Sequence, residues 1–314
     1  MSSPRKFWSS PLAPIRFAIV WLFFAWMRLL VLLPLRAQLA ICMAVGGLTG
    51  RLIRRRRRIV DTNLALCFPE LSTAEREHLT QEHFRSLGAS LAEMAMGWYG
   101  PVDEIRRRVT IVGLEHLQAG LDRGRGVILF SGHFTSFEIF FPVLAPLCPR
   151  FCGMYKEQTN PSMNRIMTAG RMRNVDEVFA KDNPRQMLRA LAKNSVAWYA
   201  SDQSFAEKGA ALIPFFGEPA MTNTAISRIA RISGATVLPY FPLRLPGQDR
   251  YRLTIAPPLP DFPSDDPIED TRRLTEQLEA FVREAPEQYW WVHQRFKARP
   301  APYPDVYAAT GDTA

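Results

Sequence analysis

Residues 127–138 read VILFSGHFTSFE, an apolar run that leads through Gly132 into a polar turn. The apolar part predicts a buried strand, because short Val/Ile/Leu/Phe runs that end in glycine are typical of strands inside a sheet. His133 then lies on the turn, and Glu138 follows five residues later. Five residues advance about 500° around an unbroken helix, so the two side chains can meet only if a helix begins near Thr135.

This arrangement predicts a catalytic imidazole. A neutral histidine with a carboxylate behind it can take a proton from a hydroxyl, because the carboxylate fixes the tautomer and stabilises the imidazolium. We therefore assign His133 as the candidate general base and Glu138 as the carboxylate that orients it. A structural reading stays open, since Thr135-x-x-Glu138 is also a capping box for a helix start. The two roles of Glu138 are compatible.

From residue 107 onward, short apolar runs alternate with amphipathic helical patterns. The expected strands are 107–112, 126–130, 151–155, 175–180, 196–201, 235–243, 250–256 and 288–292, and the expected helices are 114–123, 135–147, 161–172, 184–193, 222–233 and 268–284. The alternation predicts an α/β fold with a mostly parallel central sheet and helices on both faces. A ligand site is expected beyond the carboxyl ends of the strands, which is where His133 falls.

The net charge of +9 is concentrated near the start of the chain. Residues 1–60 hold 11 Lys/Arg and no Asp/Glu, whereas residues 61–314 hold 28 Lys/Arg against 30 Asp/Glu. The part of the chain that contains the expected sheet is therefore close to neutral, which argues against nucleic acid as a partner.

The basic N-terminal region also holds the longest apolar run. The run begins at Phe17 and, interrupted by Arg28, continues to Leu35, about 19 residues or roughly 28 Å of helix. It predicts an N-terminal membrane helix that spans the bilayer or, because a buried Arg28 is costly, lies in its interface. Six arginines within residues 51–58 favour the cytoplasmic side and an anionic membrane.

The expected organisation has three parts. Residues 1–60 form the membrane anchor and basic segment, residues 61–300 form the α/β domain, and residues 301–314 form a loosely ordered tail. A capping box at Ser72 and Glu75 predicts a helix that runs to about Gly97.

Three other stretches could share the site with His133. Arg171 and Arg173 lie two residues apart near a helix end, so one is expected to point inward and hold a phosphate. The alternative is a favourable position on the helix C-terminus. Asp202 ends the expected strand 196–201 and could instead be a turn residue. His293 and Arg295 lie in an aromatic and basic segment that could also be a core strand with a solvated edge.

No P-loop, dinucleotide-binding fingerprint or zinc-ligand spacing is present in the sequence. The four cysteines have neither a metal spacing nor a paired framework. We therefore predict no metal, no cofactor and no disulfide.

Together these motifs resemble the lipid A biosynthesis lauroyl/myristoyl acyltransferases, or late acyltransferases, within the HX4D/E glycerolipid acyltransferase superfamily. His133-x4-Glu138 is similar to the HX4D/E signature, with Glu in place of the commoner Asp. The other similar segments are residues 63–70 (NLALCFPE), 170–173 (GRMR), 196–202 (VAWYASD) and 285–300 (APEQYWWVHQRFKARP). The resemblance runs in matching order from about residue 15 to residue 300.

The resemblance implies an enzyme of the bacterial inner membrane with a single N-terminal anchor and a cytoplasmic active site. Such enzymes transfer a fatty acyl chain from acyl carrier protein to the hydroxyl of a 3-hydroxyacyl chain on a lipid A precursor, often one that carries Kdo sugars. The resemblance further implies that Arg171 binds a lipid phosphate or the developing oxyanion and that Asp202 is a second site carboxylate. Arg173, His293 and Arg295 follow as further substrate-binding candidates. The basic block would contact anionic lipid and attract the acidic carrier protein.

Several alternatives remain open from the sequence. A related acyltransferase could act on another glycolipid or aminolipid, such as a mannosylated phosphoinositide or an ornithine lipid, and coenzyme A could be the donor. A catalytically silent membrane lipid-binding protein could keep the same fold. A hydrolase would need a nucleophile, and the nearby Ser131 and Ser136 lie on no recognisable elbow. The acyl chain length depends on groove depth, which periodicity does not report.

Overall fold

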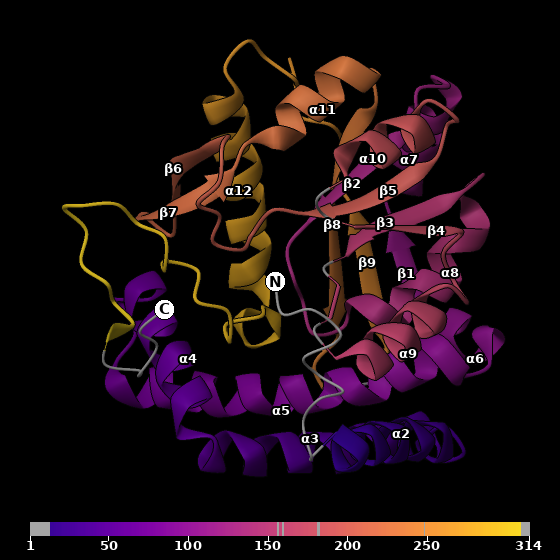
Figure 1. The fold of residues 1–314 in the computed structure, drawn as a ribbon, viewed down its shortest axis with the longest axis vertical. Coiled ribbons are helices and arrows are strands. Elements are labelled where there is room, and N and C mark those ends of the chain that lie inside the picture. Colours follow the sequence, from indigo (N-terminus) through magenta and orange to yellow (C-terminus); the bar gives the residue numbers. More distant parts are fainter. Residues whose placement is uncertain (1–12, 156, 159, 181–182, 248, 309–314) are drawn as a thin grey trace.

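The computed structural model describes residues 13–155, 157–158, 160–180, 183–247 and 249–308. Its centre is a seven-stranded sheet with the order β1-β9-β8-β2-β5-β3-β4 (Figure 1). The strands are β1 (Val109–Val112), β2 (Val127–Ser131), β3 (Phe151–Tyr155), β4 (Glu177–Ala180), β5 (Val196–Ala200), β8 (Thr236–Arg244) and β9 (Tyr251–Ile255). Every neighbouring pair is parallel except β8 and β9, so the predicted mostly parallel α/β sheet is confirmed.

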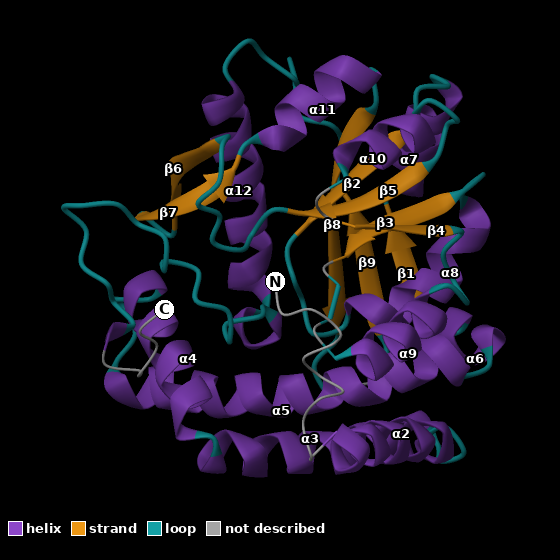
Figure 2. Cartoon of the chain, in the orientation of Figure 1, coloured by secondary structure: helices purple, strands orange, loops and turns teal. Residues whose placement is uncertain are grey.

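Helices precede the sheet and alternate with its strands (Figure 2). The first four described helices are α2 (Ala13–Leu30), α3 (Leu35–Leu52), α4 (Arg54–Cys67) and α5 (Thr73–Tyr99). The others are α6 (Val102–Arg106), α7 (Leu114–Asp122), α8 (Phe141–Leu144), α9 (Pro161–Arg171), α10 (Pro184–Leu191), α11 (Ala225–Ser233) and α12 (Pro267–Glu284). Three short 3-10 helices are η1 (Phe137–Phe140), η2 (Ala145–Leu147) and η3 (Pro286–Gln288).

The central strand β2 is buried on both faces, which explains its continuous apolar sequence. Ile128 and Phe130 belong to a core that includes residues of α10, α11 and α12. Val127 and Leu129 belong to a second core that includes residues of α5, α7 and α9. Because successive strand residues point to opposite faces, helices cover the sheet on both sides, as predicted.

Three parts of the expected element pattern differ in the structure. Residues 135–147 form η1, α8 and η2 rather than one helix, and 288–292 form no strand beyond an isolated bridge between Phe134 and Tyr289. A hairpin of β6 (Ala210–Phe215) and β7 (Glu218–Asn223) was not expected. Its two-residue turn is Phe216-Gly217, with positive φ at both positions. The usual Asn-Gly or Asp-Gly signal of such a turn is therefore missing from the sequence.

The helix predicted from the Ser72/Glu75 capping box is confirmed as α5, which starts with both reciprocal cap hydrogen bonds. At the other end of the chain, Tyr307 is buried and donates a hydrogen bond to Asn63, although it lies in the segment expected to be a loosely ordered tail. Residues 309–314 of that segment lie outside the described residues.

The N-terminal helices pack on α5 instead of standing apart from the domain. Within the described ranges, no helix meets the length and hydropathy needed to cross a bilayer, so a spanning N-terminal helix is not supported. The expected apolar run 17–35 is divided, because α2 ends at Leu30 and the chain turns at residues 31–34 before α3 begins. Phe24 and Met27 of α2 are buried. The outer side of α2 and α3 still exposes large apolar side chains. They include Ile19, Leu22, Leu29, Leu48 and Leu52.

Helices α3 and α5 touch through their backbones at a pair of glycines. A Cβ on Gly88 would lie 2.0 Å from the carbonyl oxygen of Cys42 and 2.9 Å from Cα of Gly46. This close contact explains why a glycine occupies a helix interior, where it costs stability. The contact attaches the N-terminal helices to the helix that packs against η1.

We predict that Gly88→Ala destabilises the fold by about 1–3 kcal/mol, because the added methyl pushes α3 away from α5. The midpoint and slope of denaturant unfolding measure this change. Gly153→Ala is the matched control, since a Cβ at Gly153 has nothing within 4 Å. Equal unfolding midpoints for the two variants would contradict the proposed helix contact.

Candidate active site

The site begins where two neighbouring parallel strands end. β2 and β5 pair in register, with Ser131 opposite Ala200. Two residues further along each strand direction are His133 and Asp202, which therefore reach the same edge of the sheet. Gly132 leaves room for this contact, because a Cβ there would lie 3.2 Å from Oδ2 of Asp202. The two chain segments are separated by 69 residues in sequence, but the sheet brings them together.

His133 is held by both oxygens of the Asp202 carboxylate. Its ring Nδ1 lies 2.7 Å from Oδ1, and its backbone N–H donates to Oδ2 at 2.7 Å. A carboxylate accepts hydrogen bonds, so Nδ1 carries the proton in the neutral imidazole and Nε2 keeps its lone pair. The His133 side chain is 24% exposed, whereas that of Asp202 is 2% exposed. The imidazole can therefore contact a substrate, while the Asp202 carboxylate is shielded from solvent.

Asp202 remains ionised in this buried position. Burial by itself raises the pKa of the Asp202 carboxyl, but attraction to His133 and the two hydrogen bonds from it outweigh burial. The pKa of Asp202 is consequently held well below its usual range. A buried carboxylate that stays charged stabilises the imidazolium that forms when Nε2 takes a proton.

Glu138 lies in a different cluster. Its Oε1 accepts from Nε of Arg171 at 2.8 Å and lies 2.7 Å from Nη2, while its Oε2 accepts from Nε1 of Trp98 at 3.0 Å. The expected contact of Glu138 with the imidazole is therefore wrong, and Asp202 takes that place. The reason is that no helix begins at Thr135: the chain first makes an irregular turn and then the 3-10 helix η1.

The alternative capping-box role of Thr135 and Glu138 is also absent. The Thr135 hydroxyl lies 2.8 Å from the hydroxyl of Ser86, and its backbone N–H donates to the carbonyl of Gln288 at 2.8 Å. The residue before η1, Ser136, makes no side-chain cap hydrogen bond. Both side chains of the supposed box thus serve long-range contacts instead of a helix start.

Arg171 ends α9 and is directed inward, as expected for one of the two arginines of its segment. Its side chain is 20% exposed, and its guanidinium lies 5.9 Å from the Phe137 ring centroid. The Phe137 ring stacks on Trp198, whose ring lies 5.8 Å from that of His133. A row of rings therefore separates the Arg171–Glu138 pair from the imidazole.

His293 lies beside His133, as its assignment to the site predicted. The two imidazole centroids are 5.6 Å apart. The amide nitrogen of Gln203 lies 3.4 Å from Nε2 of His133 and 3.0 Å from Nε2 of His293. Gln203 was not assigned from the sequence, and the one available signal was its position directly after Asp202.

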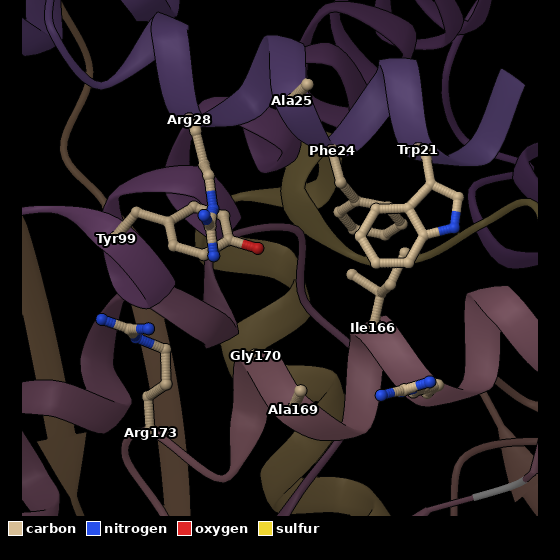
Figure 3. Close-up of a pocket in the computed structure, with 10 residues that line it drawn as sticks. Trp21, Phe24, Ala25, Arg28, Tyr99, Ile166, Ala169, Gly170 and Arg173 are labelled. Carbon is tan, nitrogen blue, oxygen red and sulfur yellow. The ribbon is translucent and has the colours of Figure 1, made fainter. Parts of the chain in front are cut away.

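Arg173 and Arg295 lie elsewhere. Arg295 is buried and donates to the Met221 carbonyl at 3.1 Å and to the Thr222 hydroxyl at 2.6 Å, so it anchors the β6–β7 hairpin. Arg173 is directed into a separate cavity beside Tyr99 (Figure 3). Among the described residues, neither arginine makes a contact with His133, and their role in substrate binding stays a prediction.

A buried polar network supports the turn that carries His133. Arg244 pairs with Glu93 at 2.7 Å and donates to Ser86 at 2.6 Å, and Ser86 in turn contacts Thr135. Sequence reasoning missed this network because the partners come from α5, β8 and the turn after β2, with no local signal. On the other side, the backbone N–H of Trp290 donates to the His133 carbonyl at 2.9 Å.

The His133–Asp202 pair has the groups that proton transfer requires. Among the residues that the structure describes, no group of three His, Cys, Asp or Glu side chains could hold a metal ion. The histidine with a buried carboxylate behind it can activate a hydroxyl.

Comparisons with known proteins place the chain in a family. A model of the family described as bacterial lipid A biosynthesis acyltransferase matches residues 5–298. The chain is 33% identical over 308 residues to the lipid A biosynthesis lauroyltransferase of Escherichia coli (strain K12), covering 98% of this chain and 100% of the relative. It is 33% identical over 293 residues to the palmitoleoyltransferase of the same organism, covering 93% and 95%.

The lipid A biosynthesis myristoyltransferase of that organism is 30% identical over 281 residues, covering 89% of this chain and 87% of the relative. The matches thus extend over nearly the whole chain, from the N-terminal helices to the segment around His293. The chain belongs to the bacterial lipid A biosynthesis acyltransferase family and is an acyltransferase.

Proposed function

We propose that this acyltransferase moves a fatty acyl chain of the lauroyl/myristoyl class from acyl carrier protein to a lipid A precursor of the Kdo-lipid IVA type. The acceptor is the hydroxyl of a 3-hydroxyacyl chain on that precursor. The observation that carries the proposal is the His133–Asp202 pair at the sheet edge, with Nδ1 2.7 Å from Oδ1. We infer from this contact that Nδ1 carries the proton and Nε2 the lone pair. Family membership supports the choice of acyl transfer to lipid A.

In the proposed reaction, Nε2 of His133 takes the proton of the acceptor hydroxyl. The hydroxyl oxygen attacks the thioester carbonyl carbon and forms the new ester C–O bond. The C–S bond then breaks, and the leaving thiolate receives the proton from the His133 imidazolium. Asp202 holds the imidazole in the required tautomer and stabilises its charged form throughout.

Arg171 is the proposed source of positive charge for the oxyanion or for a lipid phosphate. Its Nε and Nη2 are directed to Glu138, whereas Nη1 has no hydrogen-bond partner within the described residues. Glu138 thereby fixes the orientation of the guanidinium, and Trp98 fixes Glu138. In this reading Glu138 acts through Arg171 rather than through His133.

Replacing His133 by Ala is expected to lower kcat by about 10²–10⁴-fold, because the reaction loses its general base. Transfer of radiolabelled acyl groups from acyl carrier protein to the lipid A precursor measures the rate. His78→Ala is the matched control, since His78 is exposed on α5. A His133→Ala enzyme with wild-type turnover would contradict the role of His133 as general base. A wild-type protein without turnover would favour a silent lipid-binding protein.

The pH–rate profile separates the roles of the two carboxylates. Asp202→Asn is expected to lower kcat by about two to four orders of magnitude and to move the acid limb to lower pH, because the imidazolium loses its neighbouring charge. Glu138→Gln is expected to lower the rate without moving that limb. If Glu138→Gln alone moves the acid limb, then Glu138, and not Asp202, is the carboxylate that acts on the imidazole.

We further propose that the outer side of α2 and α3 lies in the cytoplasmic face of the inner membrane, next to the arginines of residues 51–58. Exposed apolar side chains beside a block of arginines suit an anionic lipid interface. Acceptor and enzyme would then share one surface, and the same arginines would attract the acidic carrier protein.

Replacing Leu22 and Leu29 together by Ser is expected to weaken binding to anionic vesicles by about tenfold per substitution, because each loses apolar contact with lipid. Flotation of the protein with phosphatidylglycerol vesicles measures binding. Ile232→Ser is the matched control, because Ile232 is 65% exposed on α11, at the opposite end of the molecule. Equal loss in both variants would contradict a membrane contact at α2.

A further inference from the structure

A cavity lies apart from the imidazole, between α2, α5 and α9 (Figure 3). Its volume is about 260 Å³. Trp21 and Phe24 enter it from α2, Ile166 faces them from α9, and Tyr99 lies at its other end. These side chains give the cavity a largely apolar wall.

Three arginines complete this cavity. Arg28, Arg165 and Arg173 line it, and all three are exposed to solvent. The guanidinium of Arg28 lies 4.9 Å from the Tyr99 ring centroid, and that of Arg173 lies 5.6 Å from the same centroid. Two positive charges are therefore held against one ring. Across the described part of the chain, none of the three arginines forms an ion pair with a carboxylate, in contrast to Arg171.

This arrangement of arginines suits an anion. Like charges that converge on one ring repel each other, and a bound dianion converts that repulsion into attraction. Guanidinium groups match phosphate geometry with paired hydrogen bonds. The apolar wall favours a phosphate that belongs to an amphiphile over free inorganic phosphate, because the rest of the ligand can cover Trp21 and Phe24.

The cavity is connected to the proposed reaction centre through one wall. Gly170 lines the cavity, and a Cβ there would lie 2.4 Å from the Trp98 ring. Trp98 donates to Glu138, and Glu138 holds Arg171, the residue that follows Gly170. A ligand group in the cavity therefore lies one side-chain layer from the Arg171–Glu138 pair.

From these contacts we infer that the cavity binds a phosphate group of the acyl acceptor while the acceptor's hydroxyl lies at His133. This inference rests on the proposed function and adds a recognition site for the acceptor. Arg28 and Arg173 bind the phosphate, Arg165 contributes long-range attraction, and the Trp21 and Phe24 rings contact the adjoining sugar or acyl group. The N-terminal helix α2 is thereby part of the substrate site.

The test compares the phosphorylated acceptor with the same glycolipid after enzymatic removal of its phosphates. In the Arg28→Gln/Arg173→Gln enzyme, KM for the phosphorylated acceptor is expected to rise about tenfold for each lost arginine, with kcat unchanged. KM for the dephosphorylated acceptor should stay at the wild-type value. Arg228→Gln is the matched control, an exposed arginine on α11 that should change neither constant.

The conservative variant separates binding from folding. Arg28→Lys/Arg173→Lys keeps both charges and should recover most of the preference for the phosphorylated acceptor, which a variant that merely fails to fold cannot do. A double Gln variant that keeps the wild-type preference overturns the inference. So does a variant whose only defect is weaker flotation with phosphatidylglycerol vesicles, because the arginines then serve bulk membrane lipid.

Failure of the inference can be told apart from failure of the proposed function. If the wild-type enzyme transfers no acyl group to either form of the acceptor, the proposed function falls and the inference falls with it. If the wild-type enzyme is active on both forms with equal KM, the proposed function stands and the phosphate site alone is overturned.

Discussion

The contact between His133 and Asp202 is the interaction on which the site depends. It requires β2 and β5 to be neighbours and parallel, because only then do the residues after both strands reach the same edge. It also requires Gly132, where a side chain would crowd the Asp202 carboxylate. A carboxylate with 2% exposure stays charged because two donors of His133 satisfy both of its oxygens. The same contact orients the His133 imidazole and offsets the free-energy cost of burying the Asp202 carboxylate.

The turn that carries His133 is held by elements far apart in the sequence. The Arg244–Glu93 pair is buried, and loss of either partner would leave an uncompensated charge in the core. This pair reaches the turn through Ser86 and Thr135, while the segment near residue 290 binds the His133 backbone. The imidazole therefore sits on a turn fixed from two sides, a condition for holding a reactive group within reach of a substrate.

The five-residue spacing of His133 and Glu138 serves two adjacent clusters instead of one pair. His133 belongs with Asp202, and Glu138 belongs with Arg171 and Trp98. Trp98 lies in the last turn of α5 and also packs against Gly170, at the wall of the cavity beside α2. The N-terminal helices are thus packed against the α/β domain. In the proposed function, the lipid contact of α2, the acceptor cavity and the site of proton transfer are neighbours in the structure.

The sequence by itself determined the α/β alternation, the mostly parallel sheet, the capping box of α5 and the position of His133 after a buried strand. These features depend on hydrophobic periodicity and on turn and cap residues, and both signals come from residues that are close in sequence. It also brought Arg171, Asp202 and His293 forward as site residues. Only the tertiary structure decided which carboxylate meets the imidazole, because that depends on strand order and on η1 replacing a helix. The inward position of Arg295 and the cavity around Arg173 were likewise decided by packing between distant elements, on which local sequence carries no information.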